Sequence, residues 1–234
     1  MARSVAGAGR RGLIRRELVD SAAMPDGGEL RLVRRGEDHM IMLGAIELMS
    51  SRSSGSEEEL ARGACARIGG RARPRLLIGG LGMGFTLRAA LDGLADAEVT
   101  VAELVPAVIV WARGPLAHLH GDSLADPRVT LVAADVAEMI EAAAGTWDAI
   151  LLDVDNGPDG LSVPGNNRLY AAAGLQAAKR ALRPGGVLAV WSSGPDAAFT
   201  RRLRQAGFET EEAVARSGRG GRGTRHVLWF ATRP

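Results

Sequence analysis

The clearest chemical signal in this sequence is a loop of alternating glycines, Gly80, Gly82 and Gly84, directly after the apolar run Leu76–Gly79. Glycine has no side chain, so a G-x-G-x-G loop lets the backbone approach a bound ligand closely. Phe85 breaks both the G-x-x-x-x-G-K-[ST] pattern of phosphate loops and the G-x-G-x-x-G pattern of dinucleotide sites. The loop therefore favours a ligand without a pyrophosphate, although a tight turn that needs positive φ angles explains the same glycines.

Two acidic residues at the ends of predicted strands extend this signal. A carboxylate at Glu103 could accept hydrogen bonds from both ribose hydroxyls, and one at Asp135 could accept from an adenine amino group. Together they predict a nucleoside ligand that carries no phosphate, such as S-adenosylmethionine, with Leu81, Leu104 and Val136 as further binding residues. We expect Glu103 to serve the ligand rather than the stability of the fold. A solvated strand-end acid and a helix N-cap are the structural alternatives.

The stretch DVDNGP holds the candidate catalytic residues, Asp153 and Asp155. Asp153 ends another predicted strand, so we expect it at the same edge of the sheet, both in contact with the ligand and beside a nucleophile. A carboxylate there could accept the proton of an attacking amine. The alternative is a polar turn with Asn156 and Gly157 at its tip.

The elements that must position these residues follow a repeating pattern from about residue 75 onward. Short apolar runs alternate with longer segments whose apolar residues recur every three or four positions, which predicts strands alternating with helices. The predicted strands are Arg75–Gly79, Val99–Glu103, Val129–Ala133, Ala149–Asp153 and Gly186–Trp191. Two further strand-like runs flank a Gly/Arg-rich loop near the C-terminus, which predicts an antiparallel pair at the edge of the sheet. The pattern predicts an α/β protein with a doubly wound, Rossmann-like, mostly parallel seven-stranded sheet.

The first part of the chain lacks this pattern and predicts a small N-terminal β appendage. We expect a flexible basic N-terminus over residues 1–14, a small β region over 15–53 and the α/β domain over 54–234. The β region holds the strand-like stretches ELRLVRR and HMIMLGAIELM, joined by a turn. The linking helix is predicted to begin with a capping box, with Ser54 as the N-cap and Glu57 as its partner.

Composition limits the classes of partner. The net charge is +2 and almost all basic residues are arginine, so a sequence pI of about 9.3 reflects a compositional bias and nucleic acid is not expected. No stretch approaches the roughly 20 apolar residues that span a bilayer, and the basic start lacks the apolar core of a signal peptide. We therefore expect a cytoplasmic protein without a membrane partner, and we leave a homodimer open.

Cysteine and histidine usage gives no support to a metal centre. Cys65 is the single cysteine, which excludes an internal disulfide, and we expect it to be a small buried apolar residue. His118 and His120 alternate in LAHLHGD, but no acid or cysteine pattern completes a set of ligands around them. No metal is expected, and helix-end or loop histidines are the better interpretation.

Several stretches in this order resemble the spermidine synthase family, a branch of the class I S-adenosylmethionine-dependent methyltransferase fold. The matching stretches are LLIGGLGMGFTLR, VTVAELVPAVIVWAR, DPRVTLVAADVAEMI, WDAILLDVDNGP and RLYAAAGLQAAKRALRPGGVLAVW. They resemble the family's glycine loop, ribose-binding strand, adenine-side segment, catalytic strand end, and following helix and strand. The resemblance implies the fold described above and a nucleoside site at Gly80, Gly82, Gly84 and Glu103.

Departures from the family decide between three functions. Family members that transfer an aminopropyl group carry an aspartate in the glycine loop, where this chain has Leu81 and Met83, and a Y-H-E-type motif where it reads SGSEEELA. We therefore expect a methyltransferase that uses intact S-adenosylmethionine as its co-substrate and a small molecule or peptide as acceptor. The alternatives are an aminopropyltransferase that uses decarboxylated S-adenosylmethionine, and a non-catalytic nucleoside-binding or dimerisation module.

Overall fold

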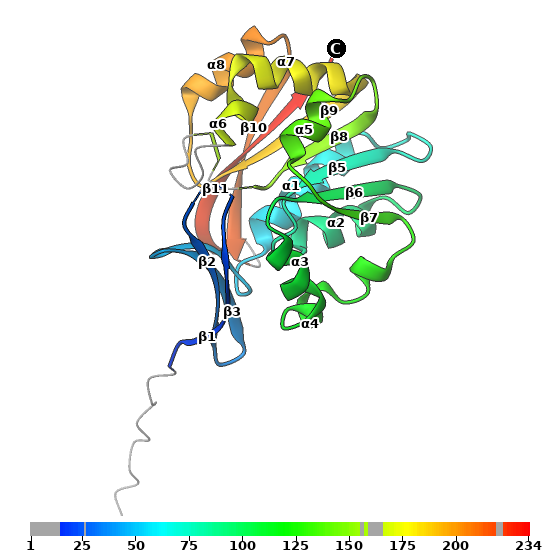
Figure 1. Ribbon diagram of the computed structural model, residues 1–234. Helices are drawn as coiled ribbons and strands as arrows, with labels where there is room; N and C mark the ends of the chain where they lie inside the picture. Colours follow the sequence, from blue (N-terminus) through cyan, green and yellow to red (C-terminus); the bar gives the residue numbers. More distant parts are fainter. Residues whose placement is uncertain (1–14, 26, 155–156, 159–165, 219–221) are drawn as a thin grey trace, which may run out of the picture.

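The computed structural model describes residues 15–25, 27–154, 157–158, 166–218 and 222–234, and these form two β-sheets with helices packed around the larger one (Figure 1). The predicted flexible segment 1–14 lies outside the described residues. The strands are β1 (Glu17–Ala23), β2 (Glu29–Arg35), β3 (Asp38–Leu43), β4 (Ile46–Ser50), β5 (Arg75–Gly79), β6 (Glu98–Glu103), β7 (Val129–Ala133), β8 (Trp147–Leu152), β9 (Leu182–Ser192), β10 (Glu209–Gly218) and β11 (Arg222–Thr232). The helices are α1 (Gly55–Arg67), α2 (Phe85–Gly93), α3 (Pro106–Arg113), α4 (Ala117–His120), α5 (Val136–Glu141), α6 (Asn167–Tyr170), α7 (Ala172–Ala181) and α8 (Ala197–Gln205).

The larger sheet has seven strands in the order β10-β11-β9-β8-β5-β6-β7. The five strands from β9 to β7 in this order run parallel, whereas β11 is antiparallel to both β9 and β10. The predicted α/β class, the seven-stranded sheet and its antiparallel C-terminal pair are therefore confirmed. The strand order reverses at β5, which pairs with β6 on one side and with β8 on the other. In doubly wound sheets this reversal leaves a crevice at the carboxyl ends of the strands, where ligands bind.

Alternating side chains of the central strands supply two hydrophobic cores, one on each face of the sheet. Leu76 and Ile78 of β5 belong to the core that α1, α2 and α3 cover. Leu77 of the same strand belongs to the core on the other face, which α5, α7 and α8 cover. Figure 1 shows α7 and α8 along the top of the molecule. Because successive residues of a strand point to opposite faces, a continuous apolar run is what a strand buried on both sides requires.

The smaller sheet is the predicted N-terminal β appendage, and it has four antiparallel strands in the order β1-β2-β3-β4. The sequence predicted two strands here. The first strand, β1, was missed, and the stretch HMIMLGAIELM is divided between β3 and β4 by a turn at Gly44, whose φ is 58°. Figure 1 shows this sheet below the larger one, beside α3 and α4. Leu32 joins the core around α1, and the Trp111 indole donates to Asp20 Oδ2 at 2.7 Å, which ties α3 to β1.

The start of α1 differs from the prediction. Ser54 is the N-cap residue, but its side chain makes no capping hydrogen bond, so the capping box with Glu57 does not form. The Ser56 hydroxyl instead donates to Glu57 Oε2 at 2.7 Å. Gly55 fits closely against the sheet, because a Cβ there would lie 2.5 Å from the Arg216 carbonyl oxygen of β10. Close packing of α1 on the sheet, rather than a side-chain cap, therefore positions its first turn.

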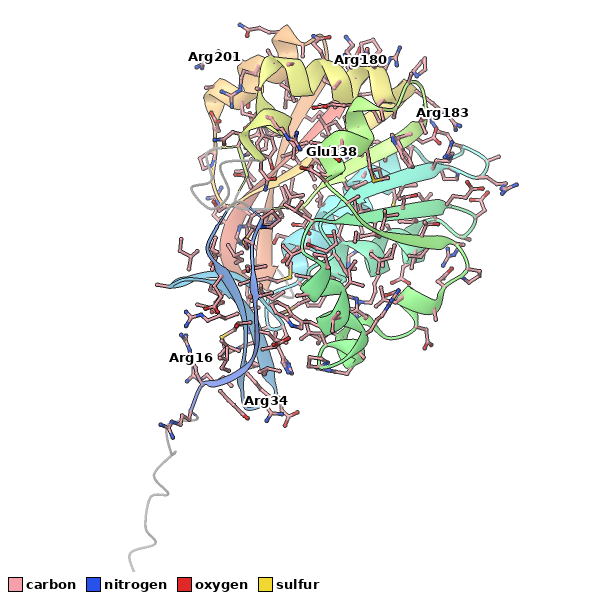
Figure 2. All side chains as sticks on the ribbon, viewed as in Figure 1. Arg16, Arg34, Glu138, Arg180, Arg183 and Arg201 are labelled. Atoms are coloured by element: carbon pink, nitrogen blue, oxygen red, sulfur yellow. The ribbon has the colours of Figure 1, made fainter. Side chains whose placement is uncertain are left out.

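Charged side chains lie mainly on the outside of the molecule. Figure 2 labels Arg16, Arg34, Arg180, Arg183 and Arg201, which lie around the periphery; Arg16 precedes β1, and the other four come from four different elements. Within the described residues, no helix is both long enough and apolar enough to cross a membrane.

Candidate active site

A pocket lies at the carboxyl ends of the central strands, next to the point where the strand order reverses, and we call it the strand-end pocket. The larger sheet contributes the ends of β5, β6, β7 and β8, with the residues Gly80, Gly82, Glu103, Leu104, Asp135, Val136 and Asp153. The N-terminal sheet contributes an apolar wall that includes Leu30, Ile41 and Met49. Met49 covers the glycine loop, since its sulfur accepts a hydrogen bond from the Met83 backbone N–H at 3.1 Å. The N-terminal appendage therefore closes one side of the predicted site.

The glycine loop connects β5 to α2 and has the geometry that its sequence suggested. Gly80, Gly82 and Gly84 all have positive φ angles, 88°, 48° and 77°. A side chain at Gly80 is also excluded sterically, because its Cβ would lie 2.3 Å from the Asp153 carbonyl oxygen. Gly80 and Gly82 line the strand-end pocket, whereas Leu81 and Gly84 do not. Leu81 is buried in the core, so any part it has in binding comes through its backbone.

Glu103 ends β6 and supports the glycine loop. Its Oε2 accepts from the Leu81 backbone N–H and its Oε1 accepts from the Val105 backbone N–H, each at 2.9 Å. Burial raises the pKa of this carboxyl, and the hydrogen bonds from Val105 and Leu81 oppose that rise. Glu103 therefore has a structural task, in addition to facing the pocket where a ribose was predicted. A carboxylate oxygen has two lone pairs, so each oxygen can still accept a hydroxyl hydrogen.

Asp135 follows β7 and begins α5. Its Oδ1 accepts from the Ala137 backbone N–H at 2.8 Å, which makes it the N-cap, and its Oδ2 pairs with the guanidinium of Arg168 from α6. Asp135 is therefore a helix N-cap, which the sequence analysis gave as the structural explanation of this residue. Asp135 and Val136 also line the strand-end pocket, so the cap lies at the position predicted for the adenine.

Asp153 lies directly after β8, and its backbone lies beside the glycine loop at Gly79 and Gly80. Its Oδ2 accepts a hydrogen bond from the Thr86 hydroxyl at 2.6 Å, and its backbone N–H donates to the Gly79 carbonyl at 3.1 Å. The structure therefore places this candidate catalytic acid in the strand-end pocket, with one carboxylate oxygen oriented by α2. The second candidate, Asp155, lies outside the described residues.

Glu57 is an acid of the strand-end pocket that the sequence analysis did not identify as a site residue. It comes from the first turn of α1, its side chain is 7% exposed, and it lines the pocket together with Asp153. Burial raises the pKa of Glu57 to about 7, and the charge of Asp153 is the second cause. A signal was available, since Glu57 shares a helical face with the buried residues Leu60, Ala61 and Ala64. An acid on an otherwise apolar buried face is uncommon unless it has a partner or a function.

His118 and His120 lie in the short helix α4, and His120 packs against the glycine loop. His120 ends α4, is 1% exposed and lies against Gly84, where a Cβ would be 2.3 Å from the ring nitrogen Nδ1. Burial lowers the pKa of His120 to about 4, so the ring is neutral at physiological pH. Among the residues that the structure describes, no group of three or more His, Cys, Asp or Glu side chains is arranged to hold a metal ion. Cys65 is buried, as expected.

Comparison with solved structures identifies the fold. A spermidine synthase from Thermotoga maritima superposes with a TM-score of 0.74 at 21% sequence identity, over 93% of this chain and 73% of that one. At this level of identity the likeness shows a shared fold.

The family follows from the sequence match. Residues 66–198 match the model of the spermine/spermidine synthase domain, which is more than half of the chain, and the protein therefore belongs to this family. A polyamine aminopropyltransferase of Mycobacterium tuberculosis (strain CDC 1551 / Oshkosh) is 32% identical over 190 residues, covering 77% of this chain and 35% of the relative. Putrescine N-methyltransferase 3 of Nicotiana tabacum is 38% identical over 114 residues, covering 48% of this chain and 28% of the relative. The chain spans about a third of the length of these curated relatives.

These matches correct the predicted function. The family model and the aminopropyltransferase relatives contradict a methyltransferase that uses intact S-adenosylmethionine, and they favour the alternative of aminopropyl transfer. The putrescine N-methyltransferase match covers less than half of the chain and does not restore the prediction. The error has a physical source. Methyl transfer was predicted because the glycine loop has no acid, but α1 contributes the acid Glu57 to the same pocket.

Proposed function

We propose that this chain carries out aminopropyl transfer, from decarboxylated S-adenosylmethionine to an amine. One observation carries the proposal. Four acidic residues, Glu57, Glu103, Asp135 and Asp153, line the strand-end pocket, and none of its described lining residues is Lys, Arg or His. Of the four, Asp135 is paired with a guanidinium, that of Arg168, which does not line the pocket. Membership of the spermine/spermidine synthase family supports the same assignment.

The charge of this pocket suits a donor whose tail is cationic. Decarboxylated S-adenosylmethionine carries a sulfonium and an ammonium, both of which carboxylates attract. Intact S-adenosylmethionine carries an additional carboxylate, which the same acids repel. At an effective dielectric of about 20, two unit charges 4 Å apart interact by about 4 kcal/mol, so one additional charge is sufficient to discriminate between the donors.

The proposed reaction is a displacement at the carbon that joins the aminopropyl group to sulfur. The neutral amine of the acceptor attacks this carbon, the carbon–sulfur bond breaks, and 5′-methylthioadenosine leaves with the bonding electrons on sulfur. The attacking nitrogen then gives up one proton, which Asp153 is placed to accept. Thr86 holds one oxygen of this carboxylate by the 2.6 Å hydrogen bond and so fixes its direction. Positioning of donor and amine supplies much of the remaining rate, because the sulfonium is already a good leaving group.

Nucleoside binding is assigned to the part of the pocket formed by the glycine loop and by the ends of β6 and β7. Glu103 is expected to accept hydrogen bonds from the ribose, Asp135 and Val136 to contact the adenine, and the backbone at Gly80 and Gly82 to lie against the nucleoside. All five line the strand-end pocket. This assignment puts the reacting carbon between the glycine loop and Asp153.

The test is a transfer assay with decarboxylated S-adenosylmethionine and a panel of amines that includes putrescine and spermidine. We expect 5′-methylthioadenosine to be released in equal amount to an aminopropylated amine, with both identified by mass spectrometry. The matched control is the same panel with intact S-adenosylmethionine. Transfer of a methyl group in either arm, without any aminopropyl product, would contradict the proposal.

A further inference from the structure

We infer that Glu57 selects the charge of the donor's side chain, by binding the ammonium of a tail that has no carboxylate. This inference deepens the proposed function and depends on it. It assigns a specificity-determining role to a residue of α1, outside the strand-end positions where the sequence placed the site.

The position of Glu57 is fixed by the packing of α1. Gly55 begins the helix against the β10 backbone, with no room for a side chain. Two residues later, Glu57 enters the strand-end pocket, and beyond it the buried Leu60 and Ala61 pack into the core. The carboxylate of Glu57 is therefore held on a rigid element that faces Asp153, rather than on a mobile loop.

The surroundings of Glu57 contain little that would balance its charge. The Ser56 hydroxyl donates to Oε2, and the neighbouring charges that act on the carboxyl are those of Asp153 and Glu58, both of the same sign. No described lining residue of the pocket is basic. A buried carboxylate without a cationic partner is costly, so an ammonium that enters the pocket gains an unusually strong interaction.

The glycine loop does not compete for this role. Its two side chains, Leu81 and Met83, are apolar and buried, so among the described residues the loop offers the donor's tail no acid. Glu57 and Asp153 both line the pocket, and the charge of Asp153 acts on the Glu57 carboxyl. We assign them separate tasks: Glu57 binds the ammonium of the donor, and Asp153 accepts the proton of the attacking amine.

The test compares three ligands on three proteins by titration calorimetry at pH 8. The ligands are decarboxylated S-adenosylmethionine, intact S-adenosylmethionine and 5′-methylthioadenosine, which has no charged tail. The proteins are the wild type, Glu57→Gln and the matched control Glu58→Gln. Glu58 is the next residue of the same helix and pairs with Arg62 at 2.7 Å, and it does not line the strand-end pocket.

We expect Glu57→Gln alone to reduce the preference for the decarboxylated donor over the intact one. Glu57→Gln should weaken binding of the decarboxylated donor by about 10- to 100-fold, the range for losing a hydrogen bond to a charged group, and so reduce its preference over the intact donor. Binding of 5′-methylthioadenosine should stay within about twofold in all three proteins, because this ligand has no ammonium. Glu58→Gln should keep the preference of the wild type between the two donors, because the charge of Glu58 is the smallest of the influences named for Glu57. Glu57→Asp, which keeps the charge on a shorter side chain, should retain part of the preference.

Two results would overturn the inference. One is an unchanged preference between the two donors in Glu57→Gln; if the wild type still transfers aminopropyl groups, the proposed function survives this result. The other is a loss of 5′-methylthioadenosine binding in Glu57→Gln, which would mean that Glu57 supports the nucleoside site as a whole. A wild type that binds the intact donor more tightly would instead contradict the proposed function, whatever the variants do.

Discussion

Glu103 and Glu57 are equally buried acids of one pocket, each with a side chain 7% exposed, yet their surroundings differ. Glu103 accepts hydrogen bonds from two backbone amides, those of Leu81 and Val105, and so shapes the glycine loop. Glu57 accepts from the Ser56 hydroxyl and from its own backbone N–H, both in the first turn of α1, and lies beside another acid, Asp153. An acid whose carboxylate accepts several backbone hydrogen bonds in the ligand-free protein has a structural role in the site. A buried acid with few such bonds is the better candidate for binding a charged ligand.

The largest effect is expected at Asp153, the neighbour of Glu57 in the pocket. Asp153→Asn keeps the shape and the acceptor oxygen for Thr86 but removes the proton acceptor, so turnover should fall by about 10²–10⁴ while 5′-methylthioadenosine still binds. The measurement is single-turnover aminopropyl transfer.

Asp148→Asn provides a matched control on the same strand. Asp148 is 1% exposed and pairs with Arg71 and Arg183 away from the pocket, so this variant should lower stability without changing the rate of the folded enzyme. Wild-type turnover in Asp153→Asn would remove Asp153 from the chemistry.

The second effect concerns the structural role of Glu103 in the glycine loop. Glu103→Ala leaves the buried N–H groups of Leu81 and Val105 without their acceptor, at about 1–3 kcal/mol each, so the free energy of unfolding should fall by roughly 2–6 kcal/mol. Urea denaturation of the ligand-free protein measures this change. A fall in stability of this size would replace the expectation from sequence that Glu103 serves the ligand rather than the stability of the fold. Unchanged stability would show that the two backbone hydrogen bonds contribute little.

The third effect is a pH dependence of stability that comes from Glu57. The pKa of Glu57 is about 7 in the folded protein, above its ordinary value of 4.5, so the folded state keeps a proton that the unfolded chain releases between these values. Stability should therefore fall as pH rises from about 4.5 to 7, and Glu57→Gln should remove a part of this fall on the order of 1–3 kcal/mol. Denaturation at several pH values, with Glu58→Gln as control, measures it. Parallel curves for wild type and Glu57→Gln would contradict the raised pKa.

The smallest effect sharpens the role of the one hydroxyl that supports Glu57. Ser56 donates to Oε2 at 2.7 Å and opposes the rise in the pKa of Glu57. Ser56→Ala should move the pH midpoint for binding the decarboxylated donor upward and weaken binding at pH 7 by about 0.5–1.5 kcal/mol. Calorimetry across pH 6–9 gives both quantities. A midpoint that moves downward would show that Ser56 does not stabilise the ionised carboxylate.

The larger domain was predictable because its signals are local and repeated. Each central strand is a short apolar run followed by a helical pattern, and strands buried on both faces need such runs. The N-terminal sheet was predicted only in part. The strand β1, ELVDSAA, is mostly exposed and shows no clean alternation, and its pairing with β2 is a contact between segments that no local pattern specifies.

The same distinction applies to the site. Glu103, Asp135 and Asp153 were found because strand ends meet at one edge of a parallel sheet, which is a rule of topology. Glu57 was missed because Ser54 and Glu57 match the local pattern of a capping box, and its neighbour Asp153 is distant along the chain. The packing of α1 against the sheet places Glu57 in the pocket, and this packing is a tertiary contact that no local sequence pattern specifies.

The central claim is that the strand-end pocket prefers a donor with a cationic, carboxylate-free tail and transfers its aminopropyl group. The most direct measurement offers the wild-type protein equal amounts of intact and decarboxylated S-adenosylmethionine with putrescine, and identifies the nucleoside products by mass spectrometry. The account predicts that 5′-methylthioadenosine and the aminopropylated amine dominate. Accumulation of S-adenosylhomocysteine and a methylated amine instead would contradict it.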